Sequence, residues 1–263
     1  MYNKYLVIIT AENKEKYISK AIKSCLNQIL CKNLKILVVY SKLSNENSLK
    51  NDFKKIKNII FLKVKEKKKL PTQDQLYKIE KASVNVKNRW ILLLDGDDLF
   101  NPKKISYLDK LVLKKNHIYL NDFITINKNS TNKYYKKKIY KKSFLYKKLF
   151  NDWPEKINTS SIIIHSNLLK KFYKLNKPYK WKFLAIDVQL ILFYYYKKKF
   201  IYLNKILTSK KEGINNLDKT FTNYFKKKYW IRRYEQHTIT KELSNKINFI
   251  DRCLTIFFKN ILK

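Results

Sequence analysis

The stretch Arg89-Trp-Ile-Leu-Leu-Leu-Asp-Gly-Asp-Asp-Leu-Phe-Asn-Pro, residues 89–102, decides the fold of this chain. Its apolar run, residues 91–94, predicts a strand buried on both faces. Asp95, Asp97 and Asp98 follow at the carboxyl end of that strand, which is where open α/β sheets bind ligands. Three carboxylates in four positions repel one another unless a cation lies between them. The stretch therefore predicts an Asp-x-Asp metal and nucleotide site.

Gly96 strengthens this interpretation, because it is one of only two glycines in 263 residues and lies inside the acidic cluster. A glycine permits a free backbone turn and the close approach of a ligand. The alternative is a simple strand-to-helix turn in which Asp98 or Asn101 caps the following helix. A cap explains one acid rather than three, so the site is favoured. Asn101 and Pro102 also predict a helix start, with the helix running to about Lys115.

Strands and helices alternate along the first hundred residues, which predicts an α/β fold with a mostly parallel central sheet flanked by helices. The chain has no G-x-G-x-x-G, G-x-x-x-x-G-K-[ST] or G-x-S-x-G motif, and this disfavours ordinary dinucleotide, P-loop and hydrolase sites. The apolar runs predict strands over residues 5–10, 36–40, 59–64 and 91–94, and helical spacing predicts helices over 16–28 and 73–86, with a short helix between the second and third strands.

The second half of the chain continues this pattern and then changes character. We predict a first domain over residues 1–213 and a basic amphipathic helical extension over residues 214–263. The expected elements after residue 115 are a strand at 117–126, an irregular or hairpin excursion at 127–142, a short helix at 143–150, strands at 162–164 and 200–203, a helix at 181–196 that carries Asp187, and helices at 217–243 and 246–262.

The composition indicates a folded, strongly basic protein. The net charge is +39 with 45% hydrophobic residues, which argues against disorder and favours anionic partners. A nucleic-acid-binding protein is one alternative, but the lysines are spread along the whole chain and no RNA- or DNA-reading motif is present. The three cysteines lack C-x-x-C spacing, and no signal peptide or long apolar run is visible. These features predict free thiols and a cytoplasmic location.

Several stretches together resemble family 2 glycosyltransferases of the GT-A fold. Residues 6–18 resemble the opening strand and turn of the family, and residues 21–28 resemble its first helix. Residues 90–98 resemble its Asp-x-Asp strand, and residues 186–190 resemble the later helix that supplies a base. Residues 204–208 resemble the segment that follows, so the resemblance covers about residues 4 to 210.

The resemblance implies an inverting transfer of a sugar from a nucleotide-diphosphate sugar to an acceptor hydroxyl. It implies a divalent cation, Mg²⁺ or Mn²⁺, with Asp97 as the main ligand. Asp95 would contact the ribose or the metal, and Asp98 would support either contact. Asp187 would be the general base that removes the proton of the acceptor. An acid that merely complements a helix dipole is the alternative for Asp187.

The same resemblance implies donor and acceptor contacts. The acceptor would be a glycan or a lipid-linked acceptor in the synthesis of a bacterial cell-surface polysaccharide or lipopolysaccharide. The basic, aromatic residues 217–263 could rest on the anionic inner face of the membrane, and packing on the sheet domain or self-association is an equal alternative. A turn before a strand is an equal alternative for Thr159 and Ser160, and a buried aromatic is the more common role for a residue such as Trp153. The donor-binding candidates are Thr10, Ala11, Glu12, Asn13, Asp95 and Gly96, and the acceptor-binding candidates are Thr159, Ser160 and Trp153.

One departure from the family pattern keeps another hypothesis open. The second strand of the family usually ends in an aspartate that reads the nucleotide base, whereas here it ends Tyr40-Ser41-Lys42. The chain is therefore also compatible with a catalytically inactive GT-A scaffold that binds a partner, although its acidic cluster argues for activity.

Overall fold

The computed structural model describes residues 4–11, 15–30, 34–66, 70–127, 130–133, 151, 153, 157–211, 223–245 and 248–262. Its centre is a nine-stranded sheet with the order β3-β2-β1-β4-β8-β6-β9-β5, and β7 pairs with β6 beside this path. The strands are β1 Tyr5–Ala11, β2 Leu34–Tyr40, β3 Ile59–Lys63, β4 Trp90–Asp95, β5 Leu99–Phe100, β6 Ile118–Asn127, β7 Ser130–Lys133, β8 Ile162–His165 and β9 Phe200–Lys211.

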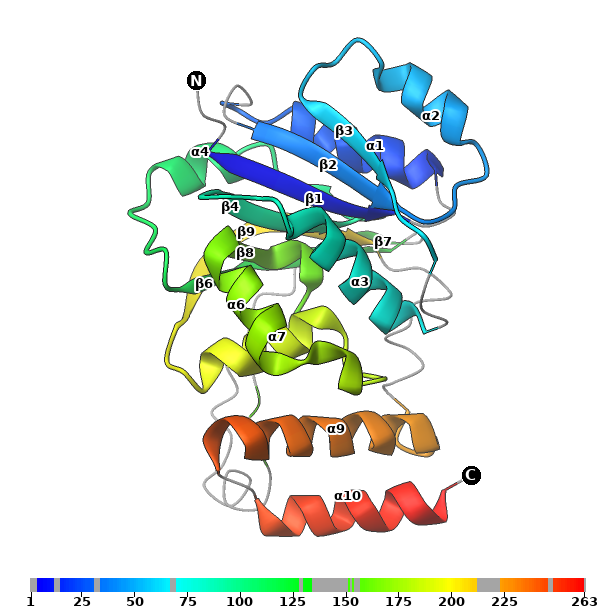
Figure 1. Ribbon diagram of the computed structural model, residues 1–263, viewed down its shortest axis with the longest axis vertical. Helices are drawn as coiled ribbons and strands as arrows, with labels where there is room; N and C mark the ends of the chain where they lie inside the picture. The colour runs from blue at the N-terminus through cyan, green and yellow to red at the C-terminus, as the bar shows by residue number, and fades with distance from the viewer. Residues whose placement is uncertain are drawn as a thin grey trace.

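The amino-terminal half of the sheet is parallel, as the strand–helix alternation predicts. β1 pairs in parallel with both β2 and β4, and β2 pairs in parallel with β3. The connecting helices are α1 Glu15–Leu26, α2 Glu46–Phe53 and α3 Pro71–Ser83. In Figure 1, α1 and α2 lie on one side of the sheet and α3 lies on the other. The expected α/β fold class is confirmed.

Alternating side chains of β4 explain why this strand is apolar throughout. Leu92 and Leu94 belong to the core beneath α1, whereas Ile91 and Leu93 belong to the core beneath α3. All four side chains are fully buried, as expected for a strand covered on both faces. The strand therefore delivers its terminal acids from the most protected part of the molecule.

The second half of the sheet is mixed. β8 pairs antiparallel with β4 and β6, and β9 runs parallel to β6 and antiparallel to β5. The hairpin expected within 127–142 is visible as β6 and β7, but residues 134–150, including the expected helix at 143–150, lie outside the described residues. The sequence pattern missed helix α6, Ser166–Asn176, and stopped β9 at residue 203, eight residues before its end.

Two predicted helices are shorter in the structure. The helix expected from residue 101 to about 115 is α4, Lys104–Asp109, because Lys103 donates its N–H to Asn101 Oδ1 and the chain first makes a turn. The helix expected from residue 181 is α7, Ile186–Tyr195. Residues 181–185 are not helical, and the N–H groups of residues 182–184 donate to a side chain rather than to a preceding helical turn.

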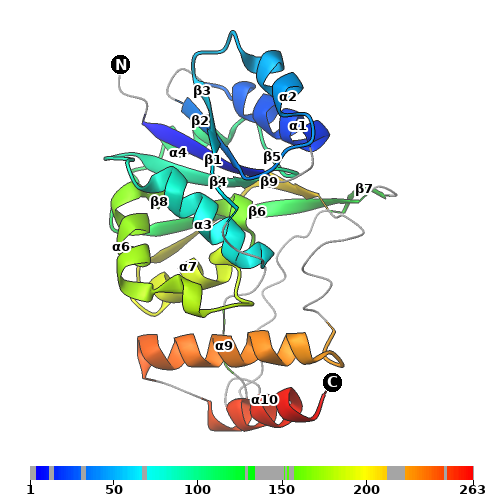
Figure 2. The ribbon, with the colours of Figure 1, turned by 45° about the vertical axis from the view of Figure 1, so that its right-hand side comes forward.

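The carboxyl-terminal part of the chain is a helical hairpin at one end of the molecule. α9, Lys227–Ser244, packs against α7, and α10, Phe249–Ile261, packs against α9 (Figures 1 and 2). Arg233 Nη2 and Asp251 Oδ1 form an ion pair of 2.6 Å between the two helices. The two predicted helices are confirmed, although α9 begins at residue 227 and residues 217–222 are outside the described residues.

No helix within the described residues is both long and apolar enough to cross a membrane.

A buried ion pair fixes α3 to the carboxyl end of β1. Lys78 Nζ lies 2.6 Å from Asp74 Oδ2, and the two side chains are only 2% and 5% exposed. Lys78 also donates to the carbonyl oxygen of Ala11, the last residue of β1, at 3.2 Å. Removing one partner of such a pair leaves the other charge buried without compensation.

We therefore expect Lys78→Met to lower the free energy of unfolding by about 3–5 kcal/mol, measured by urea denaturation. The double variant Asp74→Leu/Lys78→Met removes both charges and should recover most of that loss. Lys81→Met, on the exposed side of the same helix, is the matched control and should change stability little. Equal losses in the single and double variants would show that the lysine acts only through packing.

Candidate active site

Asp95 is held at the carboxyl end of β4 by side chains from three different segments. Thr10 of β1, its neighbour across the sheet, donates to Asp95 Oδ1 at 3.3 Å. Gln75 of α3 donates to the same oxygen at 2.6 Å, and the Asp95 N–H donates to Ser160 Oγ at 2.9 Å. Thr10 and Asp95, predicted together as donor-binding residues, are therefore adjacent. Gln75 was not predicted from the sequence.

Gly96 is required by close packing rather than by an unusual backbone angle. Its N–H donates to the carbonyl oxygen of Thr10 at 2.9 Å. A Cβ at this position would lie 3.0 Å from that same oxygen and 3.3 Å from Ile18 Cγ1 of α1. The backbone oxygen cannot move aside without disturbing β1. The glycine thus lets the acidic turn lie directly against the end of β1.

Asp98 turns inward and connects three parts of the fold. It is only 2% exposed, and it accepts hydrogen bonds from Ser160 Oγ at 2.7 Å, Asn158 Nδ2 at 3.2 Å and the Lys211 N–H at 2.9 Å. Both carboxylate oxygens therefore already have protein donors. Its metal contact stays a prediction, and its observed bonds position the turn that begins at Thr159 and the end of β9.

The electrostatics of the cluster follow from burial and from like charges. Burial raises the pKa of Asp95 well above its usual value, and the charges of Asp98, Asp97 and Asp187 raise it further, opposed by Lys210. Burial likewise raises the pKa of Asp98 to about 6, although the hydrogen bonds from Ser160 and Lys211 oppose this. The site is therefore a region of excess negative charge inside a strongly basic protein.

A buried lysine lies on the inner side of the same cluster. Lys104 of α4 is fully buried, and its Nζ donates to the Ser160 carbonyl at 3.0 Å and to Thr208 Oγ1 at 3.1 Å. Burial lowers the pKa of Lys104 well below its usual value, while the charge of Asp98 opposes this shift. This lysine helps to fix the 159–161 turn, whose Ser160 hydroxyl holds both Asp95 and Asp98.

Asp187 lies in the first turn of α7, and its charge acts on Asp95. Its Oδ1 accepts the N–H of Val188 at 2.7 Å. Just before this helix, Glu235 of α9 accepts the N–H groups of three consecutive residues, Lys182, Phe183 and Leu184, at 2.9, 2.8 and 3.1 Å.

We call Glu235 with these three N–H groups the Glu235 clamp, and it holds the segment that leads to Asp187. Sequence reasoning missed Glu235, because nothing local in α9 indicates that its partners lie 51 to 53 residues earlier. The available signal was an acid in the middle of a basic helix, in which Glu242 near the carboxyl end is the other acid.

The other predicted residues occupy different surroundings. The hydroxyl of Ser160 is buried between Asp95 and Asp98, and Trp153 Nε1 donates to Thr240 of α9 at 2.9 Å. Thr159 is buried as well, so acceptor contact by these residues stays a prediction. Ala11 is buried at the end of β1, whereas Glu12 and Asn13 lie outside the described residues.

The described residues contain no group of three His, Cys, Asp or Glu side chains arranged to hold a metal ion. Both carboxylate oxygens of Asp98 accept protein hydrogen bonds, so a cation at this turn would be held by Asp95 and Asp97. Mg²⁺ is commonly held by one or two carboxylates together with substrate phosphates rather than by a complete protein cage. The residues present fit a cation that binds with a diphosphate.

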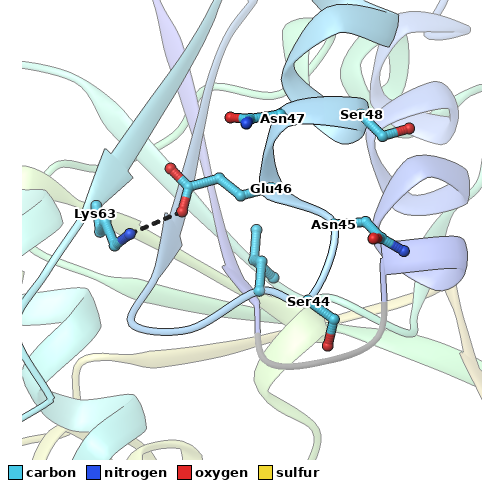
Figure 3. A pocket seen from close by; sticks show the side chains of 7 residues that line it. Ser44, Asn45, Glu46, Asn47, Ser48 and Lys63 are labelled. Carbon is cyan, nitrogen blue, oxygen red and sulfur yellow. Dashed lines mark hydrogen bonds and ion pairs between the residues drawn. The ribbon is translucent and has the colours of Figure 1, made fainter.

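The loop after β2 forms an open polar hollow at the same edge of the sheet (Figure 3). Glu46 accepts hydrogen bonds there from Lys50 at 2.7 Å, Tyr40 at 2.7 Å and Lys63 at 2.9 Å. The bond from Lys50, with those from Tyr40 and Lys63, lowers the pKa of Glu46 to about 2. A carboxylate is thus present at the start of α2, although residues 40–42 provide none.

The raised pKa of Asp98 predicts how stability depends on pH. An acid whose pKa is about 6 when folded and near 4 when unfolded stabilises the fold below pH 4, and this contribution is lost as pH rises to 6. Between about pH 4 and pH 7, the wild type should therefore lose up to about 3 kcal/mol relative to Asp98→Asn. Urea titrations at several pH values measure this difference. Parallel pH curves for the two proteins would contradict the assignment.

The fold of this chain is similar to those of several solved glycosyltransferase structures. The structure of S. aureus TarS 1–349 in complex with UDP-GlcNAc has a TM-score of 0.62 at 12% identity, over 97% of this chain and 70% of that one. Mannosyltransferase PcManGT from Pyrobaculum calidifontis, in complex with GDP-Man and Mn²⁺, has a TM-score of 0.56 at 11% identity, over 99% and 71%.

Galactosyltransferase LgtC, in complex with donor and acceptor sugar analogues, has a TM-score of 0.51 at 14% identity, over 90% of this chain and 96% of that one. At these identities the likeness concerns the fold, and it confirms the expected GT-A architecture. A search of curated protein sequences found no match. The family model described as Glycosyl transferase family 2 matches residues 6–175, well over half of the chain, and this chain therefore belongs to glycosyl transferase family 2.

Proposed function

We propose that this glycosyltransferase moves a sugar from a nucleotide-diphosphate sugar to an acceptor hydroxyl with inversion at the anomeric carbon. The observation that carries the proposal is the convergence of charge at the end of β4, where Asp95 interacts with Asp97, Asp98 and Asp187. The negative charges of the β4 turn and of the start of α7 thus lie close enough, in one small region, to raise the pKa of the same carboxyl group, that of Asp95. Such a region can hold a cation on one side and a general base on the other.

The donor would bind along the ends of β1 and β4. Thr10, Ala11, Asp95 and Gly96 line these ends, and Asp97 with Asp95 would hold Mg²⁺ or Mn²⁺, supported by Asp98. The cation would neutralise the charge that develops on the departing diphosphate. Structures with similar folds contain UDP-GlcNAc or GDP-Man with Mn²⁺, which supports this class of donor for the present chain.

Asp187 would act as the base. The acceptor oxygen would form a bond to the anomeric carbon while the bond from that carbon to the phosphate oxygen breaks. The acceptor proton would pass to Asp187, and the nucleoside diphosphate would leave. The clamp at Glu235 supports this role, because it fixes the backbone immediately before α7 and so limits the movement of the base.

For the pathway and the acceptor, we propose a glycan or lipid-linked acceptor in bacterial cell-surface polysaccharide or lipopolysaccharide synthesis, with the enzyme in the cytoplasm. The support is the sequence resemblance, together with the absence of a membrane-spanning helix among the described residues. The alternative of an inactive scaffold is supported by Tyr40 to Lys42, where the family has an acid, and by Glu46, whose carboxylate is occupied by two lysines.

Donor binding should depend on the cation and on Asp97. We expect UDP-GlcNAc or GDP-Man with Mn²⁺, at 100 times the dissociation constant, to stabilise the wild type by about 2.7 kcal/mol. That corresponds to a rise in Tm of roughly 5–10 °C in a thermal-shift assay. Asp97→Asn should remove most of the shift, whereas Asp52→Asn on the exposed side of α2 should leave it intact. A shift that persists in Asp97→Asn, or without a cation, would refute the proposed donor site.

Asp187→Asn separates the active enzyme from the inactive scaffold. A lost general base should lower kcat by about 10²–10⁴ while the donor-induced thermal shift is retained. The turnover rate can be measured without a known acceptor as hydrolysis of the donor, which is monitored through the nucleoside diphosphate that is released. Unchanged turnover in Asp187→Asn would exclude it as the base. A wild type that binds donor with a cation but never turns over, even with acceptor mixtures, would favour the scaffold.

A further inference from the structure

The outer side of α10 is an exposed apolar surface, which we call the α10 outer face. Its side chains recur at helical spacing and so lie on one side of the helix. Figure 2 shows α10 at the end of the molecule, with α9 between it and the sheet domain. The members and their exposed fractions are Phe249 78%, Ile250 47%, Leu254 39%, Phe257 57% and Ile261 59%.

The opposite side of α10 packs against the rest of the chain. The exposed apolar side chains therefore do not result from a helix that lacks its packing partner. Asp251 pairs with Arg233, and Thr255 contacts His237 Nε2 at 3.3 Å. Phe258 stacks on Trp230 with ring centroids 4.6 Å apart. The α10 outer face remains apolar although its own chain does not cover it within the described residues. Contiguous exposed apolar surface of this kind marks an interaction site.

The charge around this face identifies the partner chemistry. Residues 223–245 and 248–262 contain eight Lys or Arg and three Asp or Glu. Two of the acids, Glu235 and Asp251, are buried, and the third is paired with Lys180. Exposed Lys226, Lys227 and Lys228 lie near the carboxyl end of α10, because Trp230 of the same segment stacks on that helix.

An aromatic pair adds to the apolar surface at that end. Tyr224 and Phe225 are 62% and 81% exposed and directly precede the three lysines. Apolar side chains flanked by lysines are the composition of a helix that lies in the interface of an anionic bilayer.

We propose that the α10 outer face inserts into the headgroup region of an anionic membrane surface. The helix would lie parallel to the bilayer, with Phe249, Leu254, Phe257 and Ile261 below the headgroups and the basic residues facing anionic lipid phosphates. The sheet domain would then stand above the membrane, with α9 as the spacer that Figures 1 and 2 show. Because this surface is separate from the carboxylates of β4, the proposal does not depend on the proposed activity.

A second copy of the chain fits the same face less well. A helix of 13 residues is about 20 Å long and roughly 10 Å wide, whereas a stable protein interface buries about 800 Å² on each partner. Two copies would also bring together surfaces that are both basic, in a protein of net charge +39. The charge that opposes self-association favours binding to anionic lipid.

The experiment is vesicle flotation of the full chain without donor. We expect the wild type to float with vesicles of phosphatidylcholine and phosphatidylglycerol, and at least tenfold less with phosphatidylcholine alone. Phe249→Ser/Phe257→Ser should reduce flotation with anionic vesicles at least tenfold. The matched control is Val112→Ser/Leu175→Ser, which removes exposed apolar side chains from the sheet domain and should bind as the wild type does. Unchanged Tm values would show that all proteins are folded.

Flotation equal in Phe249→Ser/Phe257→Ser and the wild type would overturn the proposal, as would a wild type that does not float with anionic vesicles. Light scattering after size-exclusion chromatography tests the second copy. A wild-type dimer that the double serine variant converts to monomer, in the absence of lipid, would also overturn it and assign the face to self-association.

Discussion

The repulsion among carboxylates at the end of β4 is the constraint on which the rest of the structure depends. Asp98 is buried and Asp95 is half-buried, both close to other acids, and a fold can keep them there only if polar groups hold each one in place. Gln75, Thr10 and Ser160 do this for Asp95, from α3, β1 and the turn before β8. Segments distant in sequence are thus joined by the need to stabilise one small negative region.

The basic character of the chain has little part in this arrangement. Lys78 and Lys104 are the two lysines among the largest fully buried side chains, and both bind backbone oxygens near the site. Each supports an element that carries a site residue, α3 in one case and the 159–161 turn in the other. The acidic turn is held mainly by hydroxyl and amide groups, and most other lysines among the described residues are at least partly exposed.

Sequence reasoning succeeded where the signal is local. The apolar runs of β1, β2 and β4 predicted the parallel half of the sheet, and the acids after residue 94 lie at the carboxyl end of β4 as the sequence indicated. It failed where a distant partner decides the conformation. The first residues of the predicted helix at 181–196 are not helical, and Glu235 binds the N–H groups of three of them. Asp98 turns inward because Ser160 and Asn158 meet it there. Neither partner can be inferred from spacing.

The Glu235 clamp has a consequence for how the molecule unfolds. The hairpin is bonded to the sheet domain through the backbone that leads directly into α7, and Trp153 and Thr240 form a further bond between the two regions. Separation of the hairpin would leave three N–H groups without their carboxylate just before the helix that carries Asp187. The sheet domain and the hairpin are therefore coupled cooperatively, and local melting of the hairpin extends to the start of α7.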